Sequence, residues 1–144
     1  MENTEGQFSI LLIEDNDTHA EITEFYIKEA CEDAVINRIV DGEKAVEYIR
    51  KGEAGPGPLP QLILLDLKMP RFDGHEVLLE IKKNKIFKHI PVVIFTTSNS
   101  KSDVRKAFTN HANSFIIKPI EEGKFKEVIR LIINYWKLNE TVTR

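Results

Sequence analysis

Five polar side chains in this sequence come directly after short apolar runs. Glu14 and Asp15 follow ILLI, Asp66 follows LILL, Thr96 follows VVIF and Lys118 follows FII. An unpaired charge beside an apolar run is costly, which gives Asp66 particular weight. If the runs are parallel strands of one open sheet, ligands bind where their carboxyl ends meet. We therefore expect three carboxylates, one hydroxyl and one ammonium to gather at a single edge.

Such a cluster suits the transfer of a phosphoryl group. Carboxylates in close contact resist ionising together, and a divalent cation that prefers oxygen ligands, such as Mg²⁺, relieves their repulsion. A carboxylate such as Asp66 can act as a nucleophile, while the cation and Lys118 neutralise the transferred charge and Thr96 donates to a phosphoryl oxygen. Each residue alone has a simpler interpretation, as a helix cap, a strand end or a solvated lysine. The prediction depends on their joint occurrence in this order.

Along the chain, the apolar runs alternate with stretches of helical periodicity. The runs lie at 10–13, 35–40, 62–65, 92–95 and 115–117, and helices are expected at about 17–30, 42–51, 74–84, 101–110 and 120–138. Most runs are continuous, as in strands covered on both faces. Asn16, Asp41, Asp73 and Ser100 are expected helix N-caps. With right-handed crossovers, this alternation predicts an α/β fold, a (βα)5 doubly wound parallel five-stranded sheet.

Composition limits the remaining possibilities. With 144 residues we expect one domain, 1–144, with a core at about 8–138. The net charge of −3 gives no basic footprint for nucleic acid, and no apolar run approaches the ~20 residues of a membrane helix. The polar N-terminal stretch and the single cysteine, Cys31, which we read as an unreactive thiol near a helix end, favour a cytoplasmic location.

Four segments resemble the signature segments of response-regulator receiver domains, a family that includes the chemotaxis regulator. They read ILLIEDN, LILLDLKMPRFDG, PVVIFTTS and FIIKP, and the resemblance spans about residues 8–135. It implies a flavodoxin-like sheet with strand order 2-1-3-4-5, phosphorylation of Asp66 and a requirement for Mg²⁺ or Mn²⁺. It also implies that output comes from a change of shape rather than from enzymatic turnover.

The resemblance assigns further roles residue by residue. Asp15 matches the main acidic metal ligand, Glu14 assists through water, and the backbone carbonyl of Lys68 completes the protein's share, together with Asp66. Thr96 matches the switch hydroxyl and Lys118 the phosphoryl-contacting lysine.

Other matched positions concern switching and lifetime. Phe115 matches the aromatic switch position, and Lys68 and Ser98 match positions that tune how long the phosphoryl group lasts. Gly74 falls in the turn leading into the third helix. The family's geometry also implies a cis peptide between Lys118 and Pro119.

The doubled threonine of TTS and the loop GEAGPGP resemble stand-alone receivers paired with bacterial phytochromes and related sensor kinases. The expected partners are therefore a sensor histidine kinase, with a phytochrome-like kinase as one candidate, or a phosphotransfer protein, and a downstream protein target. Gly and Pro in the stretch 52–60 predict an exposed connector, with partner contact as an alternative.

Three other functions fit these residues less well. Haloacid-dehalogenase-type phosphatases also phosphorylate an aspartate after a strand, but they place a second acid two residues on, where this chain has Lys68. Flavodoxin-like electron carriers bind a flavin phosphate in the first loop, and here that loop reads EDND, which would repel it. A pseudo-receiver that only binds partners is disfavoured because no acceptor residue is missing.

Two further expectations concern side chains outside the cluster. The four histidines, His19, His75, His89 and His111, show no metal-ligand spacing and are interpreted as structural or solvated. In the last helix Phe125, Val128, Ile129, Ile132 and Trp136 form one apolar stripe that should face the sheet. Leu131, Tyr135 and Leu138 form a second stripe, which points to a homodimer through the C-terminal helix, with cover by the C-terminal tail as the alternative.

Overall fold

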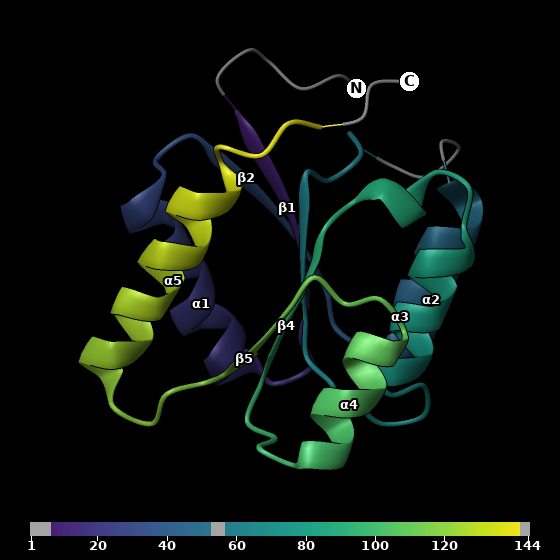
Figure 1. Cartoon of the computed structure of the whole chain (residues 1–144). Helices are drawn as coiled ribbons and strands as arrows, with labels where there is room; N and C mark the ends of the chain where they lie inside the picture. Colours follow the sequence, from purple (N-terminus) through teal and green to yellow (C-terminus); the bar gives the residue numbers. More distant parts are fainter. Residues whose placement is uncertain (1–6, 53–56, 142–144) are drawn as a thin grey trace.

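A parallel five-stranded sheet forms the centre of the molecule (Figure 1). The computed structural model describes residues 7–52 and 57–141. The strands are β1 (Phe8–Ile13), β2 (Ala34–Ile39), β3 (Leu62–Leu65), β4 (Val92–Thr96) and β5 (Ser114–Ile117), and they lie in the order β2-β1-β3-β4-β5. All four pairings are parallel. The expected (βα)5 fold and strand order 2-1-3-4-5 are confirmed.

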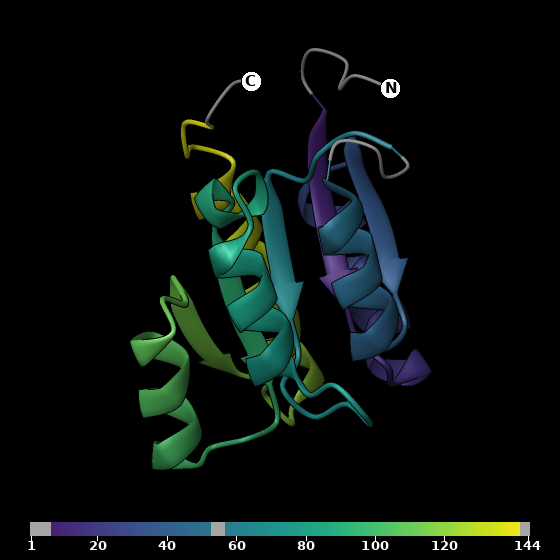
Figure 2. The ribbon, with the colours of Figure 1, turned by 90° about the vertical axis from the view of Figure 1, so that its right-hand side faces the viewer.

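Five α-helices cover the two faces of the sheet. They are α1 (Asp17–Ala30), α2 (Gly42–Lys51), α3 (Gly74–Lys83), α4 (Lys101–Thr109) and α5 (Glu122–Trp136), with a short 3-10 turn, η2 (Phe87–His89), before β4. Helices α1 and α5 lie on one face, and α2, α3 and α4 on the other (Figures 1 and 2). Each face has its own buried apolar cluster, and residues of β1, β3 and β4 contribute alternately to both.

Four helices begin at the N-caps that the sequence predicts. The side chains of Asn16, Asp41, Asp73 and Ser100 each accept a hydrogen bond from a backbone N–H three residues on. Asp73 also forms a capping box with Glu76. These caps place the start of each helix immediately after the loop that leaves a strand end.

Helix α4 is attached to the core more weakly than the other helices. Ala107 is its only buried residue, and Phe108 on the same helix is exposed. Helix α3, by contrast, buries three large apolar side chains, Val77, Leu78 and Ile81. The position of α4 therefore depends on contacts other than apolar burial.

The predicted element boundaries are close to those observed. Helix α5 is shorter than the expected 120–138, since Pro119 and the exposed Ile120 precede it in an extended loop. The loop expected over 52–60 lies partly outside the described residues. In the part of the chain that the structure describes, no helix is long and apolar enough to cross a bilayer.

Candidate phosphorylation site

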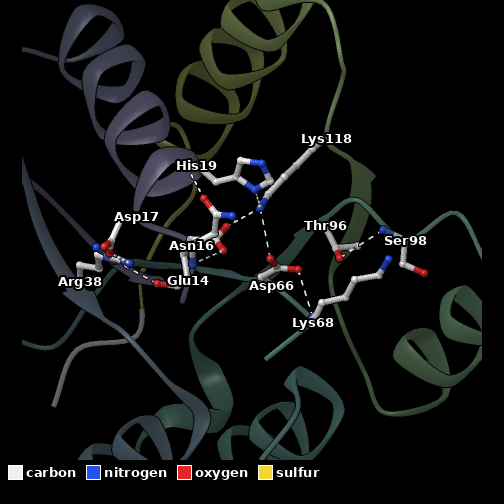
Figure 3. Close-up of polar contacts among 10 residues, drawn as sticks. All are labelled: Glu14, Asn16, Asp17, His19, Arg38, Asp66, Lys68, Thr96, Ser98 and Lys118. Atoms are coloured by element: carbon white, nitrogen blue, oxygen red, sulfur yellow. Dashed lines mark hydrogen bonds and ion pairs between the residues drawn. The ribbon is translucent and has the colours of Figure 1, made fainter. Parts of the chain in front are cut away.

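The carboxyl ends of the strands bring the predicted residues together (Figure 3). Glu14 follows β1, Asp66 follows β3, Thr96 ends β4 and Lys118 follows β5. All four side chains are buried. The parallel register places these ends at one edge, because Ile13 pairs with Leu65 and Leu65 with Ile94.

The Lys118 ammonium is the centre of the cluster. It forms ion pairs with Glu14 and, at 3.2 Å, with Asp66 Oδ2, and it lies 3.0 Å from Nδ1 of His19. An ammonium has three protons, so these three acceptors satisfy it fully. Its side chain is 2% exposed, which means that the positive charge is offset by its neighbours rather than by water.

Asp66 is held as an ionised carboxylate. Burial alone would raise its pKa, but the charge of Lys118 and hydrogen bonds from Thr96 and the backbone of Lys68 outweigh burial and lower the pKa. The backbone N–H of Lys68 donates to Asp66 Oδ1 at 3.2 Å. An ionised carboxylate has the free lone pairs that a nucleophile needs.

Glu14 has the opposite environment. Burial and the nearby charge of Asp66 raise its pKa to about 7, although Lys118 acts to lower it. Ligand atoms of Glu14, Asp15 and Asp66 all lie within 4.8 Å of one another. The three carboxylates are close enough to repel one another, and this repulsion adds to burial in making Glu14 resist ionisation. A hard divalent cation, which prefers oxygen ligands, fits such a donor set.

Two neighbouring residues were not found by reading the sequence. His19, in the first turn of α1, contacts Lys118, which is consistent with a structural histidine but places it at the site itself, a position that its spacing in the sequence did not indicate. Burial and the charge of Lys118 lower the pKa of His19, which favours the neutral ring. Arg38 on β2 donates from Nε to the backbone oxygen of Glu14 at 3.0 Å and pairs with Asp17 at 2.9 Å. Its contact fixes the turn that carries Glu14 and Asp15.

A second group of polar contacts lies beyond Thr96. The backbone N–H of Ser98 approaches Thr96 Oγ1 at 3.4 Å, and the Ser98 hydroxyl donates to Asp103 at 2.6 Å. Asp103 also accepts from His75 Nε2 at 3.0 Å. Lys68 is exposed, and in Figure 3 its side chain extends toward the side where Thr96 and Ser98 lie.

The Lys118–Pro119 bond and Phe115 are two other positions that the family resemblance singles out. The peptide bond between Lys118 and Pro119 is trans, so the expected cis bond was wrong; trans is the more stable form of an X–Pro bond by about 0.5–1 kcal/mol. Lys118 nevertheless reaches Asp66. Phe115 is partly buried against the cluster on the α2, α3 and α4 face.

Comparison with known proteins identifies the family. The sequence profile described as the response regulator receiver domain matches residues 10–130. The chain is 42% identical over 132 residues to "Probable methanogenesis regulatory protein FilR2" of Methanothrix harundinacea, covering 92% of this chain and 85% of that protein. It is 36% identical over 135 residues to the response regulator Rcp1 of Synechocystis, covering 93% of this chain and 90% of that protein.

Solved structures agree with this assignment. The phosphorylated cyanobacterial phytochrome response regulator RcpA has a TM-score of 0.86 at 31% identity, with 96% of this chain and 99% of that chain covered. The Mn²⁺-bound form of Rcp1 has a TM-score of 0.84 at 32% identity, with 95% and 99% covered. The chain belongs to the response regulator receiver domain family and is a receiver of a two-component system.

Proposed function

We propose that Asp66 accepts a phosphoryl group from a phosphorylated histidine of a sensor kinase or phosphotransfer protein. The observation that carries this proposal is the burial of an ionised Asp66 beside Lys118, within an acidic cluster at the sheet edge. The chain then passes the signal to a partner protein by a change of shape, in which Thr96 and Phe115 are the proposed switch residues.

The chain's own residues supply most of the chemistry. An oxygen of Asp66 forms a bond to phosphorus while the bond to the donor nitrogen breaks, and the electron pair returns to the donor's ring. Lys118 already contacts Asp66 and is placed to pair with a phosphoryl oxygen. The hydroxyl of Thr96, which acts to lower the pKa of Asp66, is placed to donate to another phosphoryl oxygen.

A divalent cation, Mg²⁺ or Mn²⁺, fits the same cluster. We propose Asp15 as its main acidic ligand, with Asp66, the backbone carbonyl of Lys68, and Glu14 acting through water. The proposal is supported by the crowded oxygen donors and the raised pKa of Glu14, and by the Mn²⁺-bound form of Rcp1. When bound, the cation supplies positive charge that neutralises the transferred phosphoryl group.

The test is labelling by a small phosphodonor such as acetyl phosphate. The wild type should gain one phosphoryl mass in the presence of Mg²⁺ and none in the presence of a chelator. Asp66→Asn should not be labelled, since the amide is no nucleophile of comparable strength. Asp73→Asn, a nearby helix-cap substitution outside the cluster, is the control and should be labelled like wild type. Equal labelling of Asp66→Asn would refute the assignment.

The proposed donor is a sensor kinase of the phytochrome-associated kind. RcpA is described as a phytochrome response regulator, and RtBRR, at 29% identity and a TM-score of 0.72, as a bacteriophytochrome response regulator. Phosphotransfer from purified candidate kinases, compared at short times, would identify the cognate partner by its rate.

The exposed side of α5 is the proposed surface for self-association. Leu131 and Tyr135 are exposed there and Leu138 is exposed just beyond the end of the helix, while Phe125, Ile129 and Ile132 face the core as the sequence predicts. Val128 and Trp136 are partly buried, and the ring of Trp136 meets that of Tyr135 edge to face at 4.9 Å. Three large apolar side chains on one face are costly to leave in water.

A further inference from the structure

A polar network joins the start of α4 to the start of α3. Asp103, in the first turn of α4, accepts from His75 Nε2 at 3.0 Å and from Ser98 Oγ at 2.6 Å. Ser98 Oγ in turn accepts from the backbone N–H of Ser100, the N-cap of α4, at 3.3 Å. The network therefore ties together α3, α4 and the loop that follows Thr96.

The three side chains are suited to a firm connection. Carboxylate oxygens only accept, so His75 donates through Nε2–H, and its buried Nδ1 has no hydrogen-bond partner among the described residues. His75 is 5% exposed, and water competes little for it. The hydrogen bonds from Ser98 and then His75 lower the pKa of Asp103, so the acceptor is ionised and both bonds are charge-assisted.

The network matters because α4 buries little apolar surface. Ala107 is the only buried residue of the helix, so the polar contact at its first turn adds to a small apolar attachment. At its other end the network reaches the phosphoacceptor, since Ser98 N–H approaches Thr96 Oγ1 and Thr96 acts to lower the pKa of Asp66. A change at Asp66 that moves Thr96 has a route to Asp103 through Ser98, whose N–H faces Thr96 and whose hydroxyl bonds to Asp103.

We propose that His75 and Asp103 are positioning residues that, through Ser98, hold α4 in its resting place and set how readily the loop after Thr96 responds to phosphorylation. This inference rests on the proposed phosphorylation of Asp66. His75 touches neither the donor nor Asp66, and its effect passes through Asp103. The network acts as a latch that phosphorylation has to open.

Amide hydrogen exchange tests the latch without any phosphorylation. In unphosphorylated His75→Leu, which keeps the apolar body but removes the donor, amides of α4 should exchange about fivefold faster, the effect of one lost hydrogen bond. Amides of α1 and α5 should exchange as in wild type. His75→Gln, whose amide can donate from a similar place, should restore protection. His89→Leu, which removes an exposed histidine, is the control. Unchanged exchange in α4, or a uniform rise in all helices, would overturn the latch.

Labelling of Asp66 by acetyl phosphate tests the coupling. His75→Leu should be labelled about fivefold faster than wild type, because α4 no longer resists the rearrangement. Ser98→Ala should act in the same direction, and the double variant should exceed neither single variant, since both break one network. Faster α4 exchange with a wild-type labelling rate would overturn the coupling. A wild type that is not labelled at all would refute the proposed function itself, and the exchange experiment would still decide whether the latch exists.

Discussion

Lys118 determines the charge state of the site. Its three protons are shared among Glu14, Asp66 and His19, and none remains for water. One ammonium cannot fully compensate two buried carboxylates, and the two acids respond in opposite directions. Asp66 keeps its charge, whereas the pKa of Glu14 rises to about 7. The resting site is therefore short of positive charge.

This shortage predicts that Glu14→Gln stabilises the cation-free protein. Between pH 4.5 and about 7 the folded protein binds more protons at Glu14 than the unfolded chain, so the contribution of Glu14 makes stability fall as pH rises through that window. In chelator at pH 8, Glu14→Gln should raise the free energy of unfolding by about 1–3 kcal/mol, measured by denaturant titration. Glu21→Gln, at an exposed position, is the control and should change little.

Added Mg²⁺ should make wild type, rather than Glu14→Gln, the protein with the higher free energy of unfolding. A ligand stabilises the state that binds it, and wild type should gain more stability from Mg²⁺ than Glu14→Gln does. A lower stability of Glu14→Gln in chelator would show that the pairing of Glu14 with Lys118 outweighs the cost of burying the charge.

Lys68 and Ser98 bear on how long the phosphoryl group lasts. The Ser98 hydroxyl is already committed to Asp103, so it offers no donor to orient an attacking water. The Lys68 ammonium can pair with phosphoryl oxygens and occupy the space that such a water needs. Both features favour a phosphorylated state that lasts minutes or longer.

The matching prediction is that Lys68→Asn shortens this lifetime and that adding Ser98→Glu shortens it further. Loss of about 1.4 kcal/mol of protection speeds hydrolysis roughly tenfold. Release of phosphate from the isolated, labelled protein measures the rate. Ser98→Ala breaks the bond to Asp103 without adding a carboxylate, and so separates the two effects of Ser98→Glu. Rates unaffected by Lys68→Asn would indicate that its side chain only faces solvent or a partner.

The sequence predicted the residues at the strand ends and not those that support them. Asp66, Thr96 and Lys118 each follow an apolar run, and a parallel sheet necessarily brings such ends together. His19 and Arg38 reach the same site from an adjacent helix and strand. Their contacts depend on side-chain length and direction across elements, and no spacing in the sequence reports that. The partnership of His75 with Asp103, 28 residues apart, was missed for the same reason.

At the scale of elements, the start of α3 is tied closely to the site. Gly74 donates its backbone N–H to the oxygen of Leu67 at 2.9 Å. A Cβ at this position would lie 2.3 Å from the backbone oxygen of Asp66 and 2.6 Å from Cα of Leu67. The third helix can approach the phosphoacceptor this closely only because residue 74 has no side chain.

Gly74→Ala should therefore destabilise the fold and disturb the site together. The forced movement of backbone should cost about 1–3 kcal/mol of unfolding free energy, and displacement of Asp66 should slow its labelling. Gly123→Ala is the matched control, because its Cβ would meet nothing nearer than 3.5 Å and alanine favours a helix by up to about 1 kcal/mol. A Gly74→Ala protein as stable as Gly123→Ala would contradict the close approach.

Element positions were predictable where periodicity and a cap agree. Helix α2 begins after Asp41 and ends at Lys51, as expected from the sequence. The turn η2 was missed, because Asn84 creates it by accepting from the backbone N–H groups of Ile86 and Phe87, and three residues are too few to show a period. Helix α5 begins two residues after the expected start at about 120, because Glu121 is its N-cap.

At the scale of the whole molecule, helices on both faces of the sheet leave large apolar side chains exposed, with Leu79 and Phe108 on the face of α3 and α4. The face with α1 and α5 packs a row of aromatic rings, with Phe95 and Phe125 5.2 Å apart, but α5 still leaves Leu131 and Tyr135 exposed. The side of α5 that faces the sheet is therefore buried or partly buried, and the opposite side is exposed. This asymmetry supports association with a second copy.

Sedimentation should show weak self-association of the wild type that strengthens on phosphorylation. Tyr135→Glu should abolish it, because a charge in the middle of an apolar contact has no partner there. Phe25→Glu is the control, since Phe25 on α1 is 60% exposed against 63% for Tyr135. Monomeric behaviour of the wild type with and without a phosphate mimic would contradict the proposed surface.

The edge-to-face contact between Tyr135 and Trp136 has a practical consequence. Trp136 is the only tryptophan in the sequence, and it lies where the α1 and α5 core meets the exposed side of α5. The tryptophan fluorescence of the protein, excited selectively over that of its three tyrosines, therefore comes from a single site that senses both environments. A blue shift of its emission with rising concentration would report assembly, and a red shift in denaturant would report melting of the α5 side, in each case without an added dye.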